Sequence, residues 1–255
     1  MAGRPLFVVG DVHGHRDVLA ALLRDAGLID AADHWCGGDA RLWLIGDLVD
    51  RGPDGLGAIE LAIELERSGG VGCLLGNHEV LLLCALLHGD VKLGPGRETY
   101  FDLWELNGGR LDDLRGLRSE HLEWLNARPA VAAVDGWALL HADTDRYLEL
   151  GRDLASINYA VSDVLLTAEP DDLGLLLERL TGRFGLVDPE RLERVLTALG
   201  ASRVVHGHTP IAVVLDRHPL AVTEALVSPD RRVVNVDHCL FGGGRGFVTR
   251  LDELG

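Results

Sequence analysis

Aspartate, histidine and asparagine side chains recur in five short motifs spread along this 255-residue chain. The motifs are GDVHG at residues 10–14, GDLVDRG at 46–52, GNHE at 76–79, HAD at 141–143 and HGHT at 206–209. They supply oxygen and imidazole donors without a thiolate, namely Asp11, His13, Asp47, Asn77, His141 and one or both of His206 and His208. Such donors suit one or two divalent ions such as manganese, iron or zinc. The motifs therefore predict a metal site assembled from distant segments.

The charge of this donor set favours a phosphate substrate. A site for two metal ions about 3.5–4 Å apart needs a carboxylate that bridges them, and Asp47 in the second motif is the natural bridge. Two divalent ions outweigh the carboxylates of Asp11 and Asp47, so the centre stays positive within an acidic protein. Such a centre binds a phosphate dianion and acidifies a bridging water, and the resulting hydroxide is expected to attack phosphorus.

Three residues beside the metal donors suit the remaining steps of phosphoester hydrolysis. A departing alkoxide needs a proton, and His78 is placed to supply it because its neighbour Asn77 is committed to metal. Asp50 is expected to orient the His78 imidazole and hold it charged. Arg51 is expected to grip non-bridging phosphate oxygens with its planar guanidinium.

Each motif alone has a simpler explanation. A glycine after a strand commonly serves a turn, and Asp11 or Asn77 could cap the helix that follows it. Five such motifs in one chain, each after a strand-like run, favour a shared site instead.

The runs that precede the motifs are short and rich in β-branched and aliphatic residues. They cover residues 6–9, 42–45, 71–75, 130–134, 137–140, 204–205 and 233–236, with a last short run at 247–249, and they predict buried strands. Helical spacing of apolar residues at 18–23 and 56–63 lies between the early strands, which indicates an α/β layer fold. Ligands in open α/β sheets collect at the carboxyl ends of strands, where these motifs fall.

Length and composition predict one domain over residues 1–255, with helical and loop insertions at about 90–128 and 146–200 that cap a sheet edge. The net charge of −16 argues against nucleic acid or an anionic membrane as a partner. Four scattered cysteines and no long apolar run predict free thiols, a cytoplasmic location and no membrane span. The sequence does not indicate an oligomeric state.

Several residues outside the motifs are expected to be structural. Residues 80–87 predict a core helix, and Tyr100 and Trp104 predict packing within the cap rather than a substrate platform. Five histidines lie in polar stretches and are expected at the solvated surface: His15, His34, His88, His121 and His218.

The five motifs together resemble those of the calcineurin-like metallophosphoesterases, and within them the serine/threonine protein phosphatase branch of bacteria and phages. Residues 104–109, with the pattern W-x-x-N-G-G, are similar to a segment of that branch. The resemblance implies a four-layer sandwich of two mixed β-sheets flanked by helices, with the active site at the carboxyl ends of strands. It covers residues 6–87, 138–143 and 203–249, and it leaves the second insertion poorly matched.

The resemblance also implies a role for each matched residue. The first ion would be held by Asp11 and His13, both ions by Asp47, and the second ion by Asn77, His141 and His208. His208 is preferred over His206 because it matches the histidine of the family's G-H-T signature. His78 would be the proton donor, Asp50 its partner, and Arg51 and Asn77 phosphate contacts. The family's second phosphate-binding arginine has Arg183 as its best counterpart, and the ions would be manganese, with iron or zinc as alternatives.

The resemblance leaves three functions open. The first is a phosphomonoesterase acting on phosphoserine or phosphothreonine in proteins. The second is a symmetrical dinucleoside tetraphosphate hydrolase or another enzyme for small phosphoesters; these tetraphosphate hydrolases tend to have a small residue where Asp50 stands. The third is a metal-binding regulatory module without turnover. One departure has no explanation from sequence: Asp237-His238-Cys239 occupies the place where the family usually has D-T-G.

Overall fold

Two mixed β-sheets form the centre of the protein, which is described by a computed structural model over residues 4–93 and 97–254. The first sheet has the order β3-β2-β1-β9, with β1 at Leu6–Val9, β2 at Arg41–Leu44, β3 at Val71–Cys73 and β9 at Thr249–Arg250. Strands β1, β2 and β3 are parallel, and β9 pairs with β1 in the antiparallel sense. The three parallel strands therefore end at the same edge, which is where the first three motifs begin.

The second sheet has the order β4-β5-β6-β8-β7. Its strands are β4 at Val131–Val134, β5 at Trp137–Leu140, β6 at Arg203–His206, β7 at Leu226–Val227 and β8 at Val233–Asn235. Strands β5, β6 and β8 are parallel, while β4 and β7 run antiparallel to their neighbours. The ends of β5 and β6 carry the fourth and fifth motifs, and the two-residue strand β7 was not predicted from the sequence.

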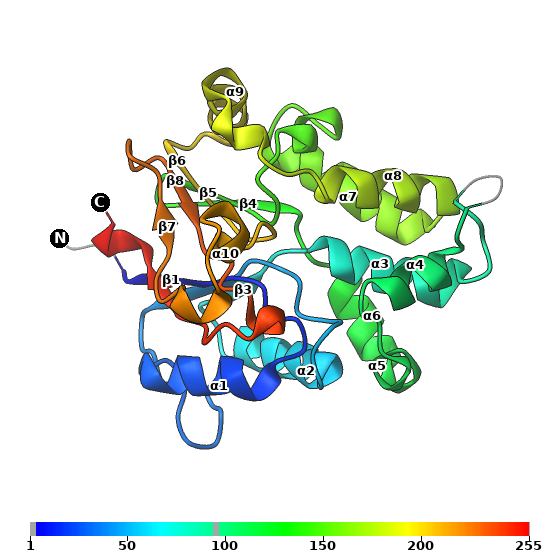
Figure 1. The fold of residues 1–255 in the computed structure, drawn as a ribbon, viewed down its shortest axis with the longest axis horizontal. Coiled ribbons are helices and arrows are strands. Elements are labelled where there is room, and N and C mark those ends of the chain that lie inside the picture. The colour runs from blue at the N-terminus through cyan, green and yellow to red at the C-terminus, as the bar shows by residue number, and fades with distance from the viewer. Residues whose placement is uncertain (1–3, 94–96, 255) are drawn as a thin grey trace.

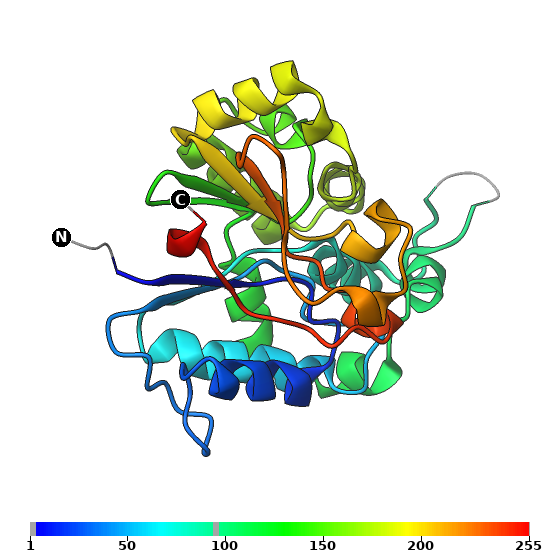
Figure 2. The same cartoon turned by 60° about the vertical axis from the view of Figure 1, so that its left-hand side comes forward.

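The two sheets pack face to face, with helices on both outer faces (Figure 2). Alternation along β1 shows how: Leu6 and Val8 belong to the apolar cluster between the sheets, and Val9 belongs to the cluster under the helices. Helices α1 (Arg16–Asp25) and α2 (Gly55–Arg67) cover the first sheet, and α9 (Pro189–Leu199) lies over the second. This architecture confirms the expected sandwich of two mixed sheets flanked by helices.

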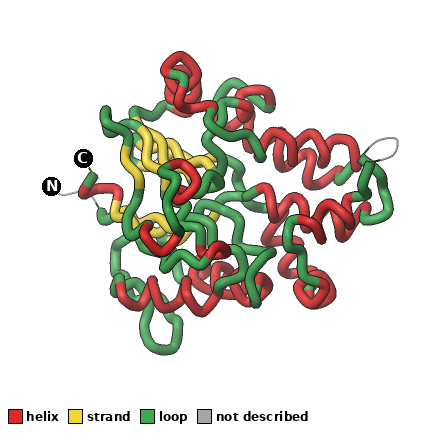
Figure 3. Tube along the Cα trace, in the orientation of Figure 1, coloured by secondary structure: helices red, strands yellow, loops and turns green. Residues whose placement is uncertain are grey.

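Helix α3 (Asn77–His88) runs from the third motif into a group of helices beside the sheets (Figures 1 and 3). It contacts α4 (Tyr100–Leu106) and α8 (Pro170–Leu180), which come from the two predicted insertions. Because neighbours surround it, residues 80–85 of α3 are all buried, as an all-apolar helix requires. The predicted core helix is confirmed, although Leu87 near its end is exposed.

The other helices of the two insertions complete this side of the molecule. The first insertion continues with α5 (Leu111–Gly116) and α6 (Ser119–Asn126), and its residues 94–96 lie outside the described residues. The second contains α7 (Leu154–Thr167), which contacts both α8 and β4. The connections contain one short helix and several 3₁₀ turns. They are α10 (Ile211–Val214), η1 (Arg146–Glu149), η2 (Gly185–Val187), η3 (Pro219–Ala221), η4 (Leu240–Gly242) and η5 (Leu251–Glu253). Within 4–93 and 97–254, no helix has the length and apolar character needed to cross a bilayer.

One prediction about the histidines outside the motifs was wrong. His34 and His218 are exposed, and His15 and His88 are partly buried, but His121 is fully buried. The His121 ring turns back over the first turn of α6, where its Nδ1 accepts a hydrogen bond from the Arg118 amide at 3.1 Å. The polar neighbours in the sequence concealed this role as a helix cap.

Candidate metal centre

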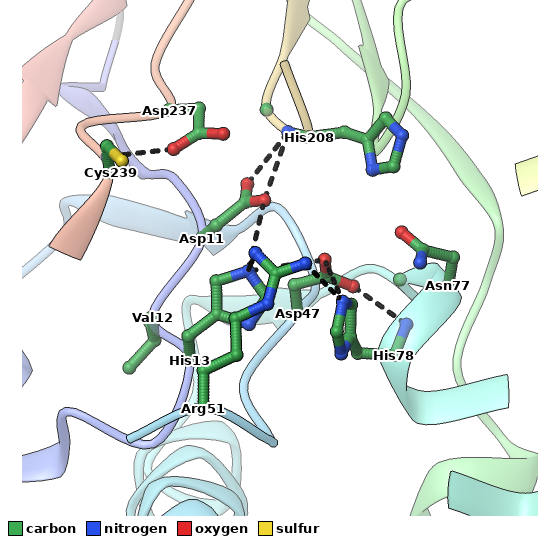
Figure 4. Close-up of polar contacts among 12 residues, drawn as sticks. Asp11, Val12, His13, Asp47, Arg51, Asn77, His78, His208, Asp237 and Cys239 are labelled. Carbon is green, nitrogen blue, oxygen red and sulfur yellow. Dashed lines mark hydrogen bonds and ion pairs between the residues drawn. The ribbon is translucent and has the colours of Figure 1, made fainter. Parts of the chain in front are cut away.

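The five motifs converge at the carboxyl ends of the strands, and Figure 4 shows residues of the first, second, third and fifth motifs gathered there. Strand β1 leads to Asp11 and His13, β2 to Asp47, and β3 to Asn77 at the start of α3. From the other sheet, β5 leads to His141 and β6 to His208. All six predicted donors are buried, each at most 5% exposed, so residues separated by up to 197 positions share one polar centre.

Asp47 lies at the middle of this centre. Its Oδ1 is 3.3 Å from Nε2 of His141, and its Oδ2 is 3.7 Å from Nε2 of His13. Two groups of possible ligands share it: one adds His13 and His78, the other His141 and His208, with the ligand atoms of each group within 4.8 Å of one another. A carboxylate with one oxygen toward each group has the arrangement that a bridging ligand needs.

Three of the histidines are held by backbone carbonyls. Nδ1 of His13 lies 3.1 Å from the carbonyl of Val49, and Nδ1 of His141 lies 2.9 Å from that of Ile45. Nε2 of His208 lies 3.2 Å from the carbonyl of Thr181. Because a carbonyl can only accept, Nδ1 of His13 and Nδ1 of His141 each carry a proton, and Nε2 of each ring is left to face a metal ion. Nε2 of His208 also accepts from Nε of Arg183 at 3.1 Å, so its carbonyl contact does not fix the tautomer of that ring.

The contacts of His141 indicate a demand for positive charge. Its Nε2 lies 2.9 Å from Oδ1 of Asn77 and 3.3 Å from Oδ1 of Asp47. If the ring were neutral with its proton on Nδ1, the lone pair of Nε2 would face these two acceptor oxygens. Burial alone would lower the pKa of His141, but the Asp47 carboxylate raises it to about 10. A divalent ion supplies the same positive charge between these lone pairs, and the donor set therefore fits a metal centre.

The pKa values of the two carboxylates of the centre, Asp11 and Asp47, shift in opposite directions. For Asp11, burial and then repulsion from Asp237 raise the pKa well above its ordinary value. For Asp47, burial acts in the same direction, but the neighbouring imidazoles of His141 and His78 bring the pKa well below its ordinary value. Asp47 is therefore the carboxylate that is most firmly ionised.

Asp11 is fixed by the fifth motif. The amide of His208 donates to its Oδ1 at 2.9 Å and lies 3.1 Å from its Oδ2. A side chain at Gly207 would bring Cβ to 2.2 Å from Oδ1 of Asp11, so this approach requires glycine. The second oxygen of Asp11 lies 3.9 Å from Nε2 of His13, which places both first-ion candidates on one side of Asp47.

His78 has a different kind of partner from the other histidines. Its Nδ1 lies 2.7 Å from Oδ2 of the fully buried Asp50. Arg51 approaches the opposite edge of the His78 ring. One of its guanidinium nitrogens lies 3.0 Å from Nε2 of His78 and the other 3.0 Å from Nε2 of His13. The Phe241 ring lies 4.2 Å from the Arg51 guanidinium, where a cation–π contact supports it. The structure thus brings together the predicted donor, its partner and the clamp.

Arg183 and His206 lie on the side of the second group. Nε of Arg183 is 3.1 Å from Nε2 of His208, so this arginine of the second insertion reaches the centre. His206 is buried with its Nδ1 2.9 Å from the carbonyl of Gly207, and it belongs to neither group of possible ligands. This placement agrees with the preference for His208 over His206.

Two buried acids that support the centre were not singled out from the sequence. Glu79 accepts hydrogen bonds from the amides of Leu48 at 2.6 Å, Asp47 at 2.9 Å and Gly76 at 2.8 Å. Burial and then the charge of Asp47 raise the pKa of Glu79 to about 7. Its place in the GNHE motif was the available signal, but two of its three partners, Asp47 and Leu48, lie 32 and 31 residues away.

The second supporting acid, Asp143, joins the fourth and fifth motifs to the second insertion. Its Oδ1 accepts from the Thr209 hydroxyl at 2.6 Å, and its Oδ2 accepts from the Phe184 amide at 2.8 Å. Phe184 has a φ of 60°, which a bulky residue adopts only when its surroundings hold it. Asp143 therefore fixes the loop that carries Arg183.

The unexplained segment Asp237-His238-Cys239 lies beside the first group. Oδ1 of Asp237 accepts from the Cys239 amide at 2.8 Å, while burial raises the pKa of Asp237 to about 6. The His238 ring is buried edge-on against Phe247, with ring centroids 5.3 Å apart. His238 thus fills an apolar position, and its replacement of the family's usual threonine has no further explanation in the structure.

A family profile described as calcineurin-like phosphoesterase matches residues 4–212. A symmetrical bis(5'-nucleosyl)-tetraphosphatase of Thioalkalivibrio sulfidiphilus is 31% identical over 179 residues, which cover 69% of this chain and 57% of that protein. Shewanella-like protein phosphatase 2 of Arabidopsis thaliana is 37% identical over 81 residues, 30% of this chain and 21% of that protein. The chain thus matches at most 57% of the length of these two relatives.

Solved structures share the fold at lower identity. A cold-active protein-tyrosine phosphatase of a psychrophilic Shewanella species superposes with a TM-score of 0.70 at 20% identity, over 96% of this chain and 74% of that one. A protein serine/threonine phosphatase of Saccharomyces cerevisiae gives a TM-score of 0.58 at 14% identity, over 96% and 71%.

Proposed function

This chain belongs to the calcineurin-like phosphoesterase family, and on that premise we propose that it is a metal-dependent phosphomonoesterase that cleaves phosphoserine or phosphothreonine in proteins. The observation that carries the proposal is the buried pair of His78 and Asp50, joined at 2.7 Å. A serine or threonine alkoxide is a strong base and leaves only when it is protonated. The buried Asp50 carboxylate beside Nδ1 orients the imidazole so that Nε2 faces the centre, where it can pass a proton to the departing oxygen.

We propose that the six buried donors hold two divalent ions, with manganese as the first choice and iron or zinc as alternatives. Asp11, His13 and Asp47 would hold the first, and Asp47, Asn77, His141 and His208 the second. When bound, such ions supply positive charge for the phosphate and lower the pKa of water. His13 and His141, whose Nδ1 each donates to a backbone carbonyl, support this assignment.

The other residues would bind the phosphate and move the proton. Arg51 grips non-bridging oxygens, with Asn77 and Arg183 as further contacts on the second side. Both imidazole nitrogens that Arg51 now touches are needed in the reaction, so its guanidinium has to shift toward the phosphate. Nε2 of His78 then donates its proton to the departing oxygen, and Asp50 stabilises the imidazole throughout.

The test compares two leaving groups in the variant His78→Asn. Loss of a general acid is expected to lower kcat/KM on a phosphoserine peptide by roughly 10²–10⁴-fold. Para-nitrophenyl phosphate, whose leaving group needs no proton, should lose far less. His34→Asn, at an exposed histidine, is the matched control and should change neither substrate. Equal losses on both substrates would remove His78 from this role.

A second candidate is the symmetrical hydrolysis of dinucleoside tetraphosphates, which the names of several relatives favour. The leaving group of that reaction is a nucleotide phosphate, a much weaker base than an alkoxide. It has less use for a buried imidazole–carboxylate pair, so we rank it second. Turnover of diadenosine tetraphosphate and of a phosphoserine peptide by the same manganese-loaded sample separates the two. A preference for the dinucleotide would reverse our ranking.

A further inference from the structure

The indole of Trp104, on helix α4 of the first insertion, reaches the carboxylate behind the proton donor. Its Nε1 donates to Oδ1 of Asp50 at 2.8 Å, while Oδ2 of the same carboxylate faces Nδ1 of His78. Trp104 and Asp50 are both fully buried, at 0% exposure. Each oxygen of Asp50 thus has its own partner, and the carboxylate cannot turn without breaking one of these bonds.

The turn that carries Asp50 is strained and needs such support. Asp50 and Arg51 have successive φ values of 65° and 66°, in the left-handed region that most non-glycine residues avoid. Two such residues in a row are costly and persist only where the surroundings hold them. This backbone conformation directs the Asp50 side chain toward His78 and the Arg51 side chain toward the metal centre.

The residues that follow Trp104 hold the second half of this turn. The carbonyl of Gly108 accepts from the Arg51 amide at 2.7 Å. A Cβ on Gly109 would lie 2.2 Å from the Trp104 ring, so glycine leaves the space that the indole fills. Segment 104–109 therefore contacts both residues of the strained turn, one through a side chain and the other through the backbone.

We infer that Trp104 is a positioning residue for proton donation: its N–H orients Asp50, and Asp50 orients His78. The inference rests on the proposed function, because it assumes that His78 protonates the leaving group. It gives the first insertion a part in the chemistry. The motifs supply His78 and Asp50, and the first insertion supplies the Trp104 N–H that holds Asp50 in place. Trp104 does not touch the phosphate and acts only through the Asp50 carboxylate.

The variant Trp104→Phe keeps most of the buried ring and removes the N–H. We expect kcat on a phosphoserine peptide to fall about tenfold, the scale of one hydrogen bond to a charged group, with KM unchanged. Turnover of para-nitrophenyl phosphate and the manganese content should stay near the values of the unmodified protein. Trp124→Phe is the matched control, because the Trp124 indole also donates to a carboxylate, that of Glu66, away from the centre.

One further variant, Gly109→Ala, keeps the inference testable if Trp104→Phe unfolds. Gly109→Ala retains the indole but pushes it from its place, and we expect the same selective loss on the phosphopeptide. In an Asp50→Asn background, Trp104→Phe should add no further selective loss, because its route to His78 is already broken.

The outcomes separate the inference from the proposed function. If His78→Asn loses activity on the phosphopeptide selectively but Trp104→Phe and Gly109→Ala lose both substrates equally, the positioning role is wrong and the proposed function stands. If His78→Asn itself shows no selectivity, the proposed function fails. Additive losses in the double variant with Asp50→Asn would also overturn the inference.

Discussion

Two halves of the centre use the same residue type for opposite purposes. On the metal half, His13 and His141 each give Nδ1 to a backbone carbonyl, which leaves Nε2 of each ring facing the carboxylates of the centre. On the donor half, Nδ1 of His78 faces the carboxylate of Asp50, a partner that suits a ring whose Nε2 passes a proton to the leaving group. The partner of the second nitrogen, more than the histidine itself, determines which chemistry the ring performs.

The two halves also differ in how the fold supports them. The metal half is built from strand ends, and two of its histidine partners, Val49 and Ile45, belong to the second motif and the strand end before it. The donor half depends on a strained turn that the first insertion holds through Trp104 and Gly108. Substitutions in the metal half should therefore affect every substrate, and substitutions in the donor half should affect only substrates with poor leaving groups.

The largest effect is expected from Asp47→Asn, which removes the shared carboxylate of the metal half. Activity on all substrates should fall by more than about 10³-fold, because both ions lose a ligand and the charge of the centre changes. Kinetics on the phosphopeptide and on para-nitrophenyl phosphate, together with metal analysis of the purified variant, check this. If the variant keeps its full metal content and loses activity on the phosphopeptide alone, the metal half does not act on every substrate, and the division between the halves is wrong.

Asp50→Asn is the corresponding change in the donor half. We expect a loss of roughly 10²-fold on phosphoserine peptides, little change on para-nitrophenyl phosphate and unchanged metal content. Asp33→Asn, at a surface aspartate paired with Arg16 and Arg24, serves as the control for removing one acidic charge. A variant that loses its metal would show that Asp50 supports the centre as a whole.

Glu79→Gln tests the support beneath the metal half. The carboxylate accepts three backbone amides around Asp47, and an amide side chain cannot accept all of them. Metal affinity should fall about 10–100-fold, as for other losses of a group that orients a ligand. Glu66→Gln, at a glutamate that accepts from Trp124 and Arg128, is the matched control in a calorimetric titration with Mn²⁺. Equal affinities for Glu79→Gln and the control would dismiss this role.

The smallest effect is a shift in thermal stability. Saturating manganese at about 100 times its Kd adds about 2.7 kcal/mol to folding, which corresponds to roughly 5–10 °C in Tm for a chain of this size. His78→Asn should keep this shift, and Asp47→Asn should lose it. Thermal unfolding with and without manganese shows whether the two halves separate in this way.

Much of the metal half could be predicted from the sequence, and much of its support could not. Asp11, His13 and Asp47 stand in short glycine-bounded motifs directly after strands, so local pattern and strand order bring them together. Glu79, Asp143 and Trp104 bond to partners 32, 66 and 54 residues away, and no local pattern reports such contacts. The same reason accounts for His121, whose burial depends on how α6 packs, and for the two-residue strand β7.

The most direct test of the two-ion centre is anomalous diffraction from manganese-soaked crystals, measured at the manganese absorption edge. Two peaks are expected, one on each side of the Asp47 carboxylate, the first beside His13 and the second beside His141 and His208. A single peak, or peaks away from Asp47, would contradict the two-ion centre.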